Sequence, residues 1–138
     1  MPEANGPVTF LNKTYDEAVA LLVETRNYLA YGGVKERGDL DPVDGLHFSL
    51  ETLRLTAILT ELMAWLLVQK AVFAGEITRK AAAHPPYRLA GHAVCVAEGA
   101  GVERLPAGVQ RLLERARRLY TRVDRLDGML NGQPIMST

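Results

Sequence analysis

The side chains of this chain that could take part in metal or nucleophilic chemistry are three histidines and one cysteine: His47, His84, His92 and Cys95. The H-x-x-C spacing of His92 and Cys95 supplies two potential metal ligands. A zinc site needs three or four, and the other two histidines have no motif relation to this pair. We therefore expect isolated polar or packing residues here, with no metal and no cofactor. A metal- or ligand-binding bundle built on His92 and Cys95 is the weaker alternative.

The sequence contains none of the common catalytic motifs. The patterns G-x-S-x-G, Walker A, G-x-G-x-x-G and H-E-x-x-H are absent. Inward-facing E-x-x-H pairs, which bind two metal ions in carboxylate-bridged helical bundles, are absent as well. We therefore predict no catalytic residues and no enzymatic activity.

One charged pattern stands out near the C-terminus, where arginines recur at steps of 4, 3, 4 and 3. These residues, called the arginine ridge below, are Arg111, Arg115, Arg118, Arg122 and Arg125. On a helix they would share the face opposite the apolar stripe. The ridge is either a solvated face paired to acids such as Glu17 and Glu24, or a docking surface for an acidic partner. Nucleic acid is a weaker alternative, because the net charge is zero and no readout motif accompanies the ridge.

The apolar stretch of residues 49–74 must organise the rest of the chain. It has no glycine or proline, and its apolar residues lie on two sides of a helix rather than on one stripe. One side holds Phe48, Leu55, Ile58, Leu59, Leu62, Leu66 and Phe73. Such a helix is expected to be buried on nearly all sides, as the central pillar of a helical protein. Charged residues interrupt the stretch too often for a membrane span, so no membrane partner is expected.

The second apolar side of this helix is a candidate dimer face, formed by Leu53, Ala57, Met63, Ala64, Leu67 and Ala71. Three alanines recur every seven residues, which would let another helix approach closely. The two readings are about equally favoured: either the other two long helices cover both sides, or a second copy of the chain packs on this side.

The boundaries of the remaining elements are predicted from helix-capping residues and from glycine and proline. Residues 1–13 are predicted to be an extended lead-in, residues 14–131 a helical domain, and residues 132–138 a short flexible tail. A T-x-x-E capping box at Thr14 predicts a first helix over 15–31, ended by Gly32-Gly33. Asp41-Pro42 or Asp44 begins the long helix, which runs to about residue 74.

The third long helix is predicted over residues 106–131. The stretch 84–105 before it is predicted to be irregular, with a short helix around residues 88–97. The fold class is therefore all-α: a three-helix bundle of long antiparallel helices with a partly irregular connection before the third helix.

Composition limits the functional class. The chain has 16 basic and 16 acidic residues, a single cysteine, and no basic start or apolar run of a signal peptide. Acidic residues prevail in the first half and basic residues near the C-terminus, an asymmetry that could pair within one molecule or between two. We expect a soluble cytoplasmic protein.

Three segments resemble the alphaproteobacterial RcdA family (regulator of CtrA degradation). They are residues 14–30, residues 62–76 with their Met-Ala-Trp-Leu-Leu-Val-Gln-Lys core, and residues 119–127. The core of the second segment is the most specific of the three. The resemblance spans about residues 14–130.

The resemblance implies a dimeric three-helix bundle that acts as a non-enzymatic adaptor in regulated proteolysis. Such an adaptor tethers cell-cycle regulatory proteins, including a master transcription factor, to the ClpXP protease once a receiver-domain protein has primed it. Further implied partners are a cyclic-di-GMP-binding adaptor and a second copy of the chain. The implied location is the cytoplasm, with recruitment to the cell pole.

Overall fold

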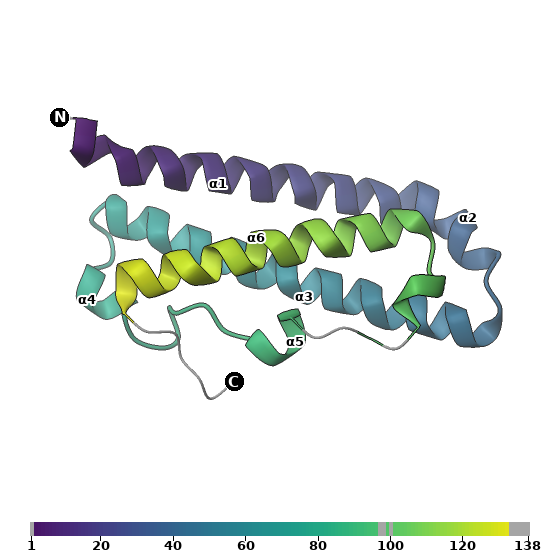
Figure 1. The fold of residues 1–138 in the computed structure, drawn as a ribbon. Helices are drawn as coiled ribbons and strands as arrows, with labels where there is room; N and C mark the ends of the chain where they lie inside the picture. The colour runs from purple at the N-terminus through teal and green to yellow at the C-terminus, as the bar shows by residue number, and fades with distance from the viewer. Residues whose placement is uncertain (1, 97–98, 100, 133–138) are drawn as a thin grey trace.

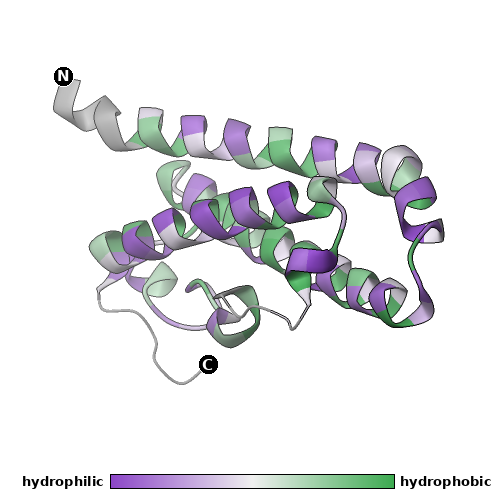
Figure 2. Ribbon diagram, turned by 45° about the vertical axis from the view of Figure 1, so that its right-hand side comes forward, coloured by the Kyte–Doolittle hydropathy of each residue, from purple (hydrophilic) through white to green (hydrophobic). Residues whose placement is uncertain are grey.

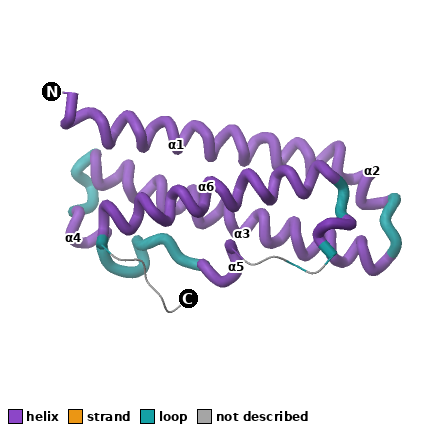
Figure 3. The backbone as a smooth tube through the Cα atoms, viewed as in Figure 1, coloured by secondary structure: helices purple, strands orange, loops and turns teal. Residues whose placement is uncertain are grey.

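The computed structural model of this protein describes residues 2–96, 99 and 101–132. Three long helices form the body of the fold (Figures 1 and 3): α1 (Pro2–Asn27), α3 (Pro42–Phe73) and α6 (Ala107–Asn131). No residue in the described part of the chain lies in a strand. The predicted all-α bundle is confirmed.

The long central helix α3 begins where its capping residues predict. Asp41 is extended and its Oδ1 accepts a 2.8 Å hydrogen bond from the backbone N–H of Asp44, while Pro42 occupies the first turn. The helix ends after Phe73, and Gly75 follows with a φ of +81°, a conformation that favours glycine. Asp41-Pro42 therefore starts this helix, as one of the two predicted alternatives.

The predicted extended lead-in of residues 1–13 is wrong, because α1 already begins at Pro2. Leu11 and Ala18, seven positions apart, are both buried in the core, and a helix brings such residues to one face. Thr14 does not cap a helix start. Its hydroxyl donates a 2.9 Å hydrogen bond to the carbonyl of Phe10, inside a continuous helix.

The predicted stop at Gly32-Gly33 is also wrong. The chain continues through a π-helical turn (Tyr28–Gly32) into the short helix α2 (Gly33–Gly38), with both glycines in the right-handed region. A Cβ on Gly33 would lie 3.0 Å from the carbonyl oxygen of Tyr28. Glycine is used here for close packing rather than for a left-handed cap, and the true connection shrinks to residues 39–41.

The helix α1 runs antiparallel to α3, as predicted, but the helix α6 does not. Arg117 of α6 pairs with Glu51 of α3, and Asp127 of α6 bonds to Trp65 of α3, so residue numbers rise together along both helices. The helices α3 and α6 are therefore parallel. Adjacent helices are antiparallel when the connection is short, whereas residues 74–106, at up to about 3.3 Å per residue, can return along the whole bundle.

The returning segment contains the short helices α4 (Arg79–Ala82) and α5 (His92–Val96) and a 3₁₀ turn (Val102–Arg104). The predicted irregular connection with one short helix near residues 88–97 is thus confirmed, with α5 as that helix. The third long helix begins at Ala107, one residue after the predicted boundary. Of the predicted tail, residues 133–138 lie outside the described residues.

The core lies between α1, the inner side of α3 and α6. The predicted inner residues of α3 are buried, except that Phe73 is 41% exposed at the end of the helix. Trp65 of α3 and Tyr120 of α6 are the largest fully buried side chains. Figure 2 shows that α6 presents a mainly hydrophilic outer face. The predicted burial of α3 on nearly all sides is wrong for a single chain, because its second apolar side is largely open.

Candidate functional site

The outer face of α6 carries the arginine ridge as predicted. All five of its arginines are exposed on the side of α6 that faces away from the core. The amphipathic pattern of the helix explains this placement, because the intervening apolar residues Leu112, Ala116, Leu119 and Val123 are buried. The ridge is therefore one continuous basic strip at the surface.

Part of the ridge is paired with acids of α1. Arg115 makes a two-pronged contact with Glu24, with hydrogen bonds of 2.9 and 2.6 Å, and Arg122 pairs with Glu17. The hydrogen bond from Arg115 lowers the pKa of Glu24 below its usual value. The predicted alternative of pairing with Glu17 and Glu24 is confirmed for these two arginines.

The remaining ridge arginines differ in their surroundings. Arg118 pairs with Glu114 one turn earlier on the same helix. Neither Arg111 nor Arg125 makes an ion pair or hydrogen bond with any residue that the structure describes. Among the described residues, the two ends of the ridge thus keep positive charge that no ion pair compensates.

A shallow groove of about 720 Å³ runs along one flank of the ridge. We call it the arginine groove. Its lining includes Arg117, Arg118, Arg122 and Arg125 with Gln110 and Thr121, and Glu114 is the acid among its lining residues. A second hollow of about 220 Å³ lies on the other flank, between α1 and α6. Sequence spacing identified the ridge but missed Arg117, which lies outside the 4-3-4-3 series.

A buried carboxylate lies beneath the arginine groove. Glu51 of α3 is only 2% exposed, and Arg54 donates to it at 2.5 Å. Arg117 of α6 lies 3.6 Å from the other carboxylate oxygen. Two guanidinium groups, one from α3 and one from α6, thus share one buried carboxylate. Nothing in the sequence pattern pointed to this cluster, because its members come from two helices.

The outer side of α3 is the second candidate surface. Of the six predicted dimer-face residues, Leu53 and Leu67 are 67% and 51% exposed, Ala64 is exposed, and Ala57, Met63 and Ala71 are partly exposed. The alternative that α1 and α6 cover both sides of α3 is therefore wrong for a single chain. Val43, Leu46 and Leu50 extend the open face toward the start of α3, and the sequence analysis missed them although they follow the same spacing.

An apolar groove of about 500 Å³ adjoins this face, between α1 and α3. Leu22 and Leu29 of α1 and Met63, Ala64 and Leu67 of α3 are among its lining residues. This places Met63 in the wall of the groove rather than on the outermost line of α3. The groove and the exposed leucines together form a surface suited to a helix from another protein or another copy.

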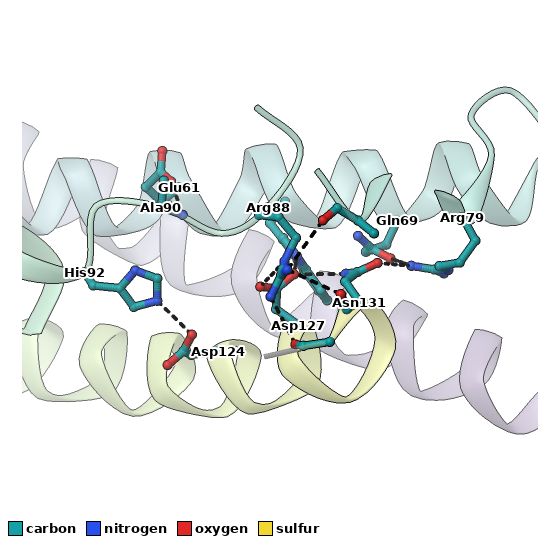
Figure 4. Close-up of polar contacts among 12 residues, drawn as sticks. Glu61, Gln69, Arg79, Arg88, Ala90, His92, Asp124, Asp127 and Asn131 are labelled. Carbon is teal, nitrogen blue, oxygen red and sulfur yellow. Dashed lines mark hydrogen bonds and ion pairs between the residues drawn. The ribbon is translucent and has the colours of Figure 1, made fainter. Parts of the chain in front are cut away.

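Inside the bundle, a polar cluster is centred on Asp127 (Figure 4). Its Oδ1 accepts hydrogen bonds from Trp65 Nε1 at 2.8 Å and Asn131 Nδ2 at 2.9 Å, and its Oδ2 accepts one from Arg88 Nε at 2.9 Å. Arg88 also donates to the carbonyls of Asn131 and Gly132 at the end of α6. The cluster fastens the returning segment to the ends of α3 and α6, so its role is structural.

His92 and Cys95, the two candidate metal ligands, have different surroundings. His92 Nε2 lies 2.8 Å from Asp124 Oδ1, and the Cys95 thiol is 1% exposed. Burial raises the pKa of Cys95 to about 11, so the thiol is protonated at neutral pH. Within the described ranges, no group of three potential ligands converges on a common point.

Among the described residues, α3 is long and apolar enough to cross a membrane by length and composition alone. Of its most apolar stretch, 39% is buried inside the protein. Core helices of soluble proteins meet the same criterion, so this is weak evidence. The absence of a membrane partner stays a prediction.

Comparison with known proteins places this fold in a family. Residues 7–137 match the family model described as "Protein of unknown function (DUF1465)". The search of the curated proteins gave no match. Among solved structures, the crystal structure of RcdA from Caulobacter crescentus CB15 is similar, with a TM-score of 0.71 and 36% sequence identity over 87% of this chain and 89% of that one. The resemblance found in the sequence is confirmed, and the chain belongs to this RcdA-like family.

Proposed function

We propose that this protein is a non-enzymatic adaptor that tethers cell-cycle regulatory proteins to the ClpXP protease for regulated degradation. The observation that carries the proposal is the 36% identity to RcdA over most of both chains. An RcdA-like protein is expected to act by holding other proteins together rather than by chemistry.

The surface of the molecule supports a binding role. The ridge on α6 and the outer side of α3 are long, exposed and unlike each other, one basic and one apolar. An adaptor that holds cargo beside a protease makes their encounter effectively intramolecular. Two distinct surfaces are the minimum that such tethering requires.

The proposed partners are ClpXP primed by a receiver-domain protein, a cyclic-di-GMP-binding adaptor and the transcription regulators that serve as cargo. The proposed location is the cytoplasm, with recruitment to the cell pole. These assignments rest on the family resemblance.

We also propose a homodimer formed through the outer side of α3. Exposed or partly exposed positions recur there at alternating steps of three and four, the spacing of a coiled-coil seam. We call this line of residues the outer seam: Val43, Leu46, Leu50, Leu53, Ala57, Thr60, Ala64, Leu67 and Ala71.

The outer seam is complementary to itself when two copies run antiparallel. Its first half carries valine and leucines, and its second half carries two alanines and one threonine beside Leu67. A two-fold axis between Ile58 and Leu59 would bring large residues opposite small ones in most layers. The layers would be Val43 with Ala74, Leu46 with Ala71, Leu50 with Leu67, Leu53 with Ala64, and Ala57 with Thr60. A two-fold pairing of this kind is the commonest form of soluble oligomer.

A reconstituted degradation assay tests the adaptor function. Purified ClpXP, the receiver-domain priming protein and the transcription-factor cargo are combined with and without this protein, and cargo is followed over time. We expect faster loss of cargo when the protein is present and the protease is primed. Equal cargo half-lives in both reactions would contradict the proposal.

A further inference from the structure

We propose that the arginine groove on α6 binds an extended, acidic peptide segment of a partner protein. The inference names the chemistry of one partner of the proposed adaptor and rests on that function for the role of the complex. Binding of the peptide itself can be measured without the protease.

The groove has the length of a short peptide. Its lining residues on α6 run from Gln110 to Arg125. At about 1.5 Å per residue, this stretch of helix is roughly 22 Å long. An extended chain advances about 3.3 Å per residue, so the groove can accommodate about six or seven peptide residues.

The charge of the groove selects acidic side chains. Four guanidinium groups line it, and Glu114 is the one acid among its described lining residues; Arg117 and Arg122 also pair with Glu51 and Glu17 outside the groove. Arg125 makes no ion pair with any described residue, and the pair of Arg118 with Glu114 is highly exposed on both sides. Exposed pairs of this kind are weak, so a carboxylate from a bound peptide can replace Glu114.

The α1 helix already shows how the ridge receives carboxylates. Glu17 and Glu24 lie seven residues apart on α1 and pair with Arg122 and Arg115. The contact between Arg115 and Glu24 has the two-pronged geometry in which a guanidinium group binds a carboxylate best. These two acids therefore compete with an incoming acidic peptide for the ridge.

The groove also favours a peptide over nucleic acid. Carboxylates of Glu17, Glu24 and Glu114 flank the arginines, and they would repel a continuous line of phosphates. A peptide can place its acidic side chains between them and its apolar ones against Val102 and Leu113, which also line the groove. This combination of charged and apolar lining suits an acidic segment of mixed composition.

Fluorescence anisotropy with three labelled probes of equal length tests the inference. The probes are a glutamate peptide of mixed composition (ELEELE), its glutamine counterpart (QLQQLQ) and a six-nucleotide oligothymidylate. We expect the glutamate peptide to bind at low salt, to weaken as salt rises, and to bind at least about tenfold tighter than either other probe. Binding of the glutamine peptide or the oligonucleotide as tight as that of the glutamate peptide would overturn the proposal.

Paired variants locate the site. Arg118→Glu with Arg125→Glu should weaken binding of the glutamate peptide about tenfold or more. Lys35→Glu with Lys80→Glu changes the net charge equally at exposed positions outside the groove and should change binding less than about twofold. Glu17→Gln with Glu24→Gln should tighten binding, because it removes the competing carboxylates. Equal losses in the first two variants would place the site elsewhere, and circular dichroism confirms that each variant is folded.

Peptide binding and cargo degradation, measured separately, distinguish this inference from the proposed function. If the protein accelerates cargo degradation but does not bind the glutamate peptide, only the peptide site is refuted. If the peptide binds as described but cargo turnover never changes, the adaptor function fails and the peptide site stands.

Discussion

Replacing Asp127 with Asn tests whether the buried polar cluster holds the two ends of the bundle together. Asp127 is 1% exposed and Arg88 is 8% exposed, and they are joined at 2.9 Å (Figure 4). Asp127→Asn keeps the size of the side chain and an acceptor for Trp65, but it removes the negative charge that pairs with Arg88 Nε. Removing one partner of a buried ion pair costs about 3–5 kcal/mol, and the retained acceptor places this case near about 3 kcal/mol.

That loss is large for a single domain. Domains of this size have stabilities of about 5–15 kcal/mol, and about 3 kcal/mol would lower the melting temperature by roughly 10 °C. Urea unfolding is followed both by circular dichroism and by the fluorescence of Trp65, the single tryptophan, which donates to Asp127. Both signals should report the same transition midpoint if unfolding is two-state.

Asp124→Asn is the matched control, because Asp124 lies one turn away on α6 with its carboxylate partly exposed beside His92. We expect it to cost about 1 kcal/mol or less. A second control adds Arg88→Met to Asp127→Asn: because both charges of the buried pair are then removed, the double variant should be more stable than Asp127→Asn alone. Two results would refute this role of the ion pair. One is that Asp127→Asn costs no more unfolding free energy than Asp124→Asn, and the other is that the double variant is no more stable than Asp127→Asn alone.

Three further predictions concern packing, titration and assembly. Gly108→Ala should destabilise the protein by about 1–3 kcal/mol in urea unfolding, because the new Cβ would lie 2.4 Å from the ring of Tyr28. Gly45→Ala should stabilise it slightly, because the new Cβ inside α3 would have no neighbour within 4 Å. A Gly108→Ala protein more stable than the Gly45→Ala protein would contradict the contact with Tyr28. Because the pKa of Cys95 is raised from 9.0 to about 11, the folded state holds its proton longer, so stability should fall as pH rises from about 9 to 11, and less steeply in Cys95→Ala; equal slopes would show that another group is responsible. Leu53→Glu should give monomers in sedimentation without loss of fold, while Met129→Glu, at an equally exposed position on α6, should leave the proposed dimer intact; a shared oligomeric state of both variants would exclude the outer seam.

Helix boundaries set by local side chains could be predicted from the sequence, and those set by distant contacts could not. Asp41-Pro42 fixes the start of α3 through a cap and a ring geometry that involve only neighbouring residues. The T-x-x-E pattern at Thr14 is ambiguous, because the same hydroxyl can bond to the carbonyl of Phe10 within a helix. Gly33 continues the helix because it packs against Tyr28, a contact that composition does not reveal.

The candidate surfaces also differ in whether neighbouring residues or distant segments form them. The arginine ridge could be predicted, since helical spacing alone places its residues on one face. The arginine groove could not, because Val102 and the buried Glu51 come from other segments of the chain. The parallel course of α6 was missed for a related reason: only contacts such as that of Trp65 with Asp127 reveal which way the long connection returns.

The two surfaces are arranged so that one can be used without blocking the other. In the part of the chain that the structure describes, no residue lines both the arginine groove and the apolar groove beside the outer seam. A dimer paired through α3 would therefore keep both of its arginine grooves open, one on each copy. Because binding at two linked sites raises avidity without new contacts, such a dimer could retain an acidic partner whose single-site affinity is weak and salt-sensitive. The balanced charge of the chain does not argue against this use, since Glu17 and Glu24 of α1 and Glu114 of α6 pair with only three of the five ridge arginines in the described part of the chain.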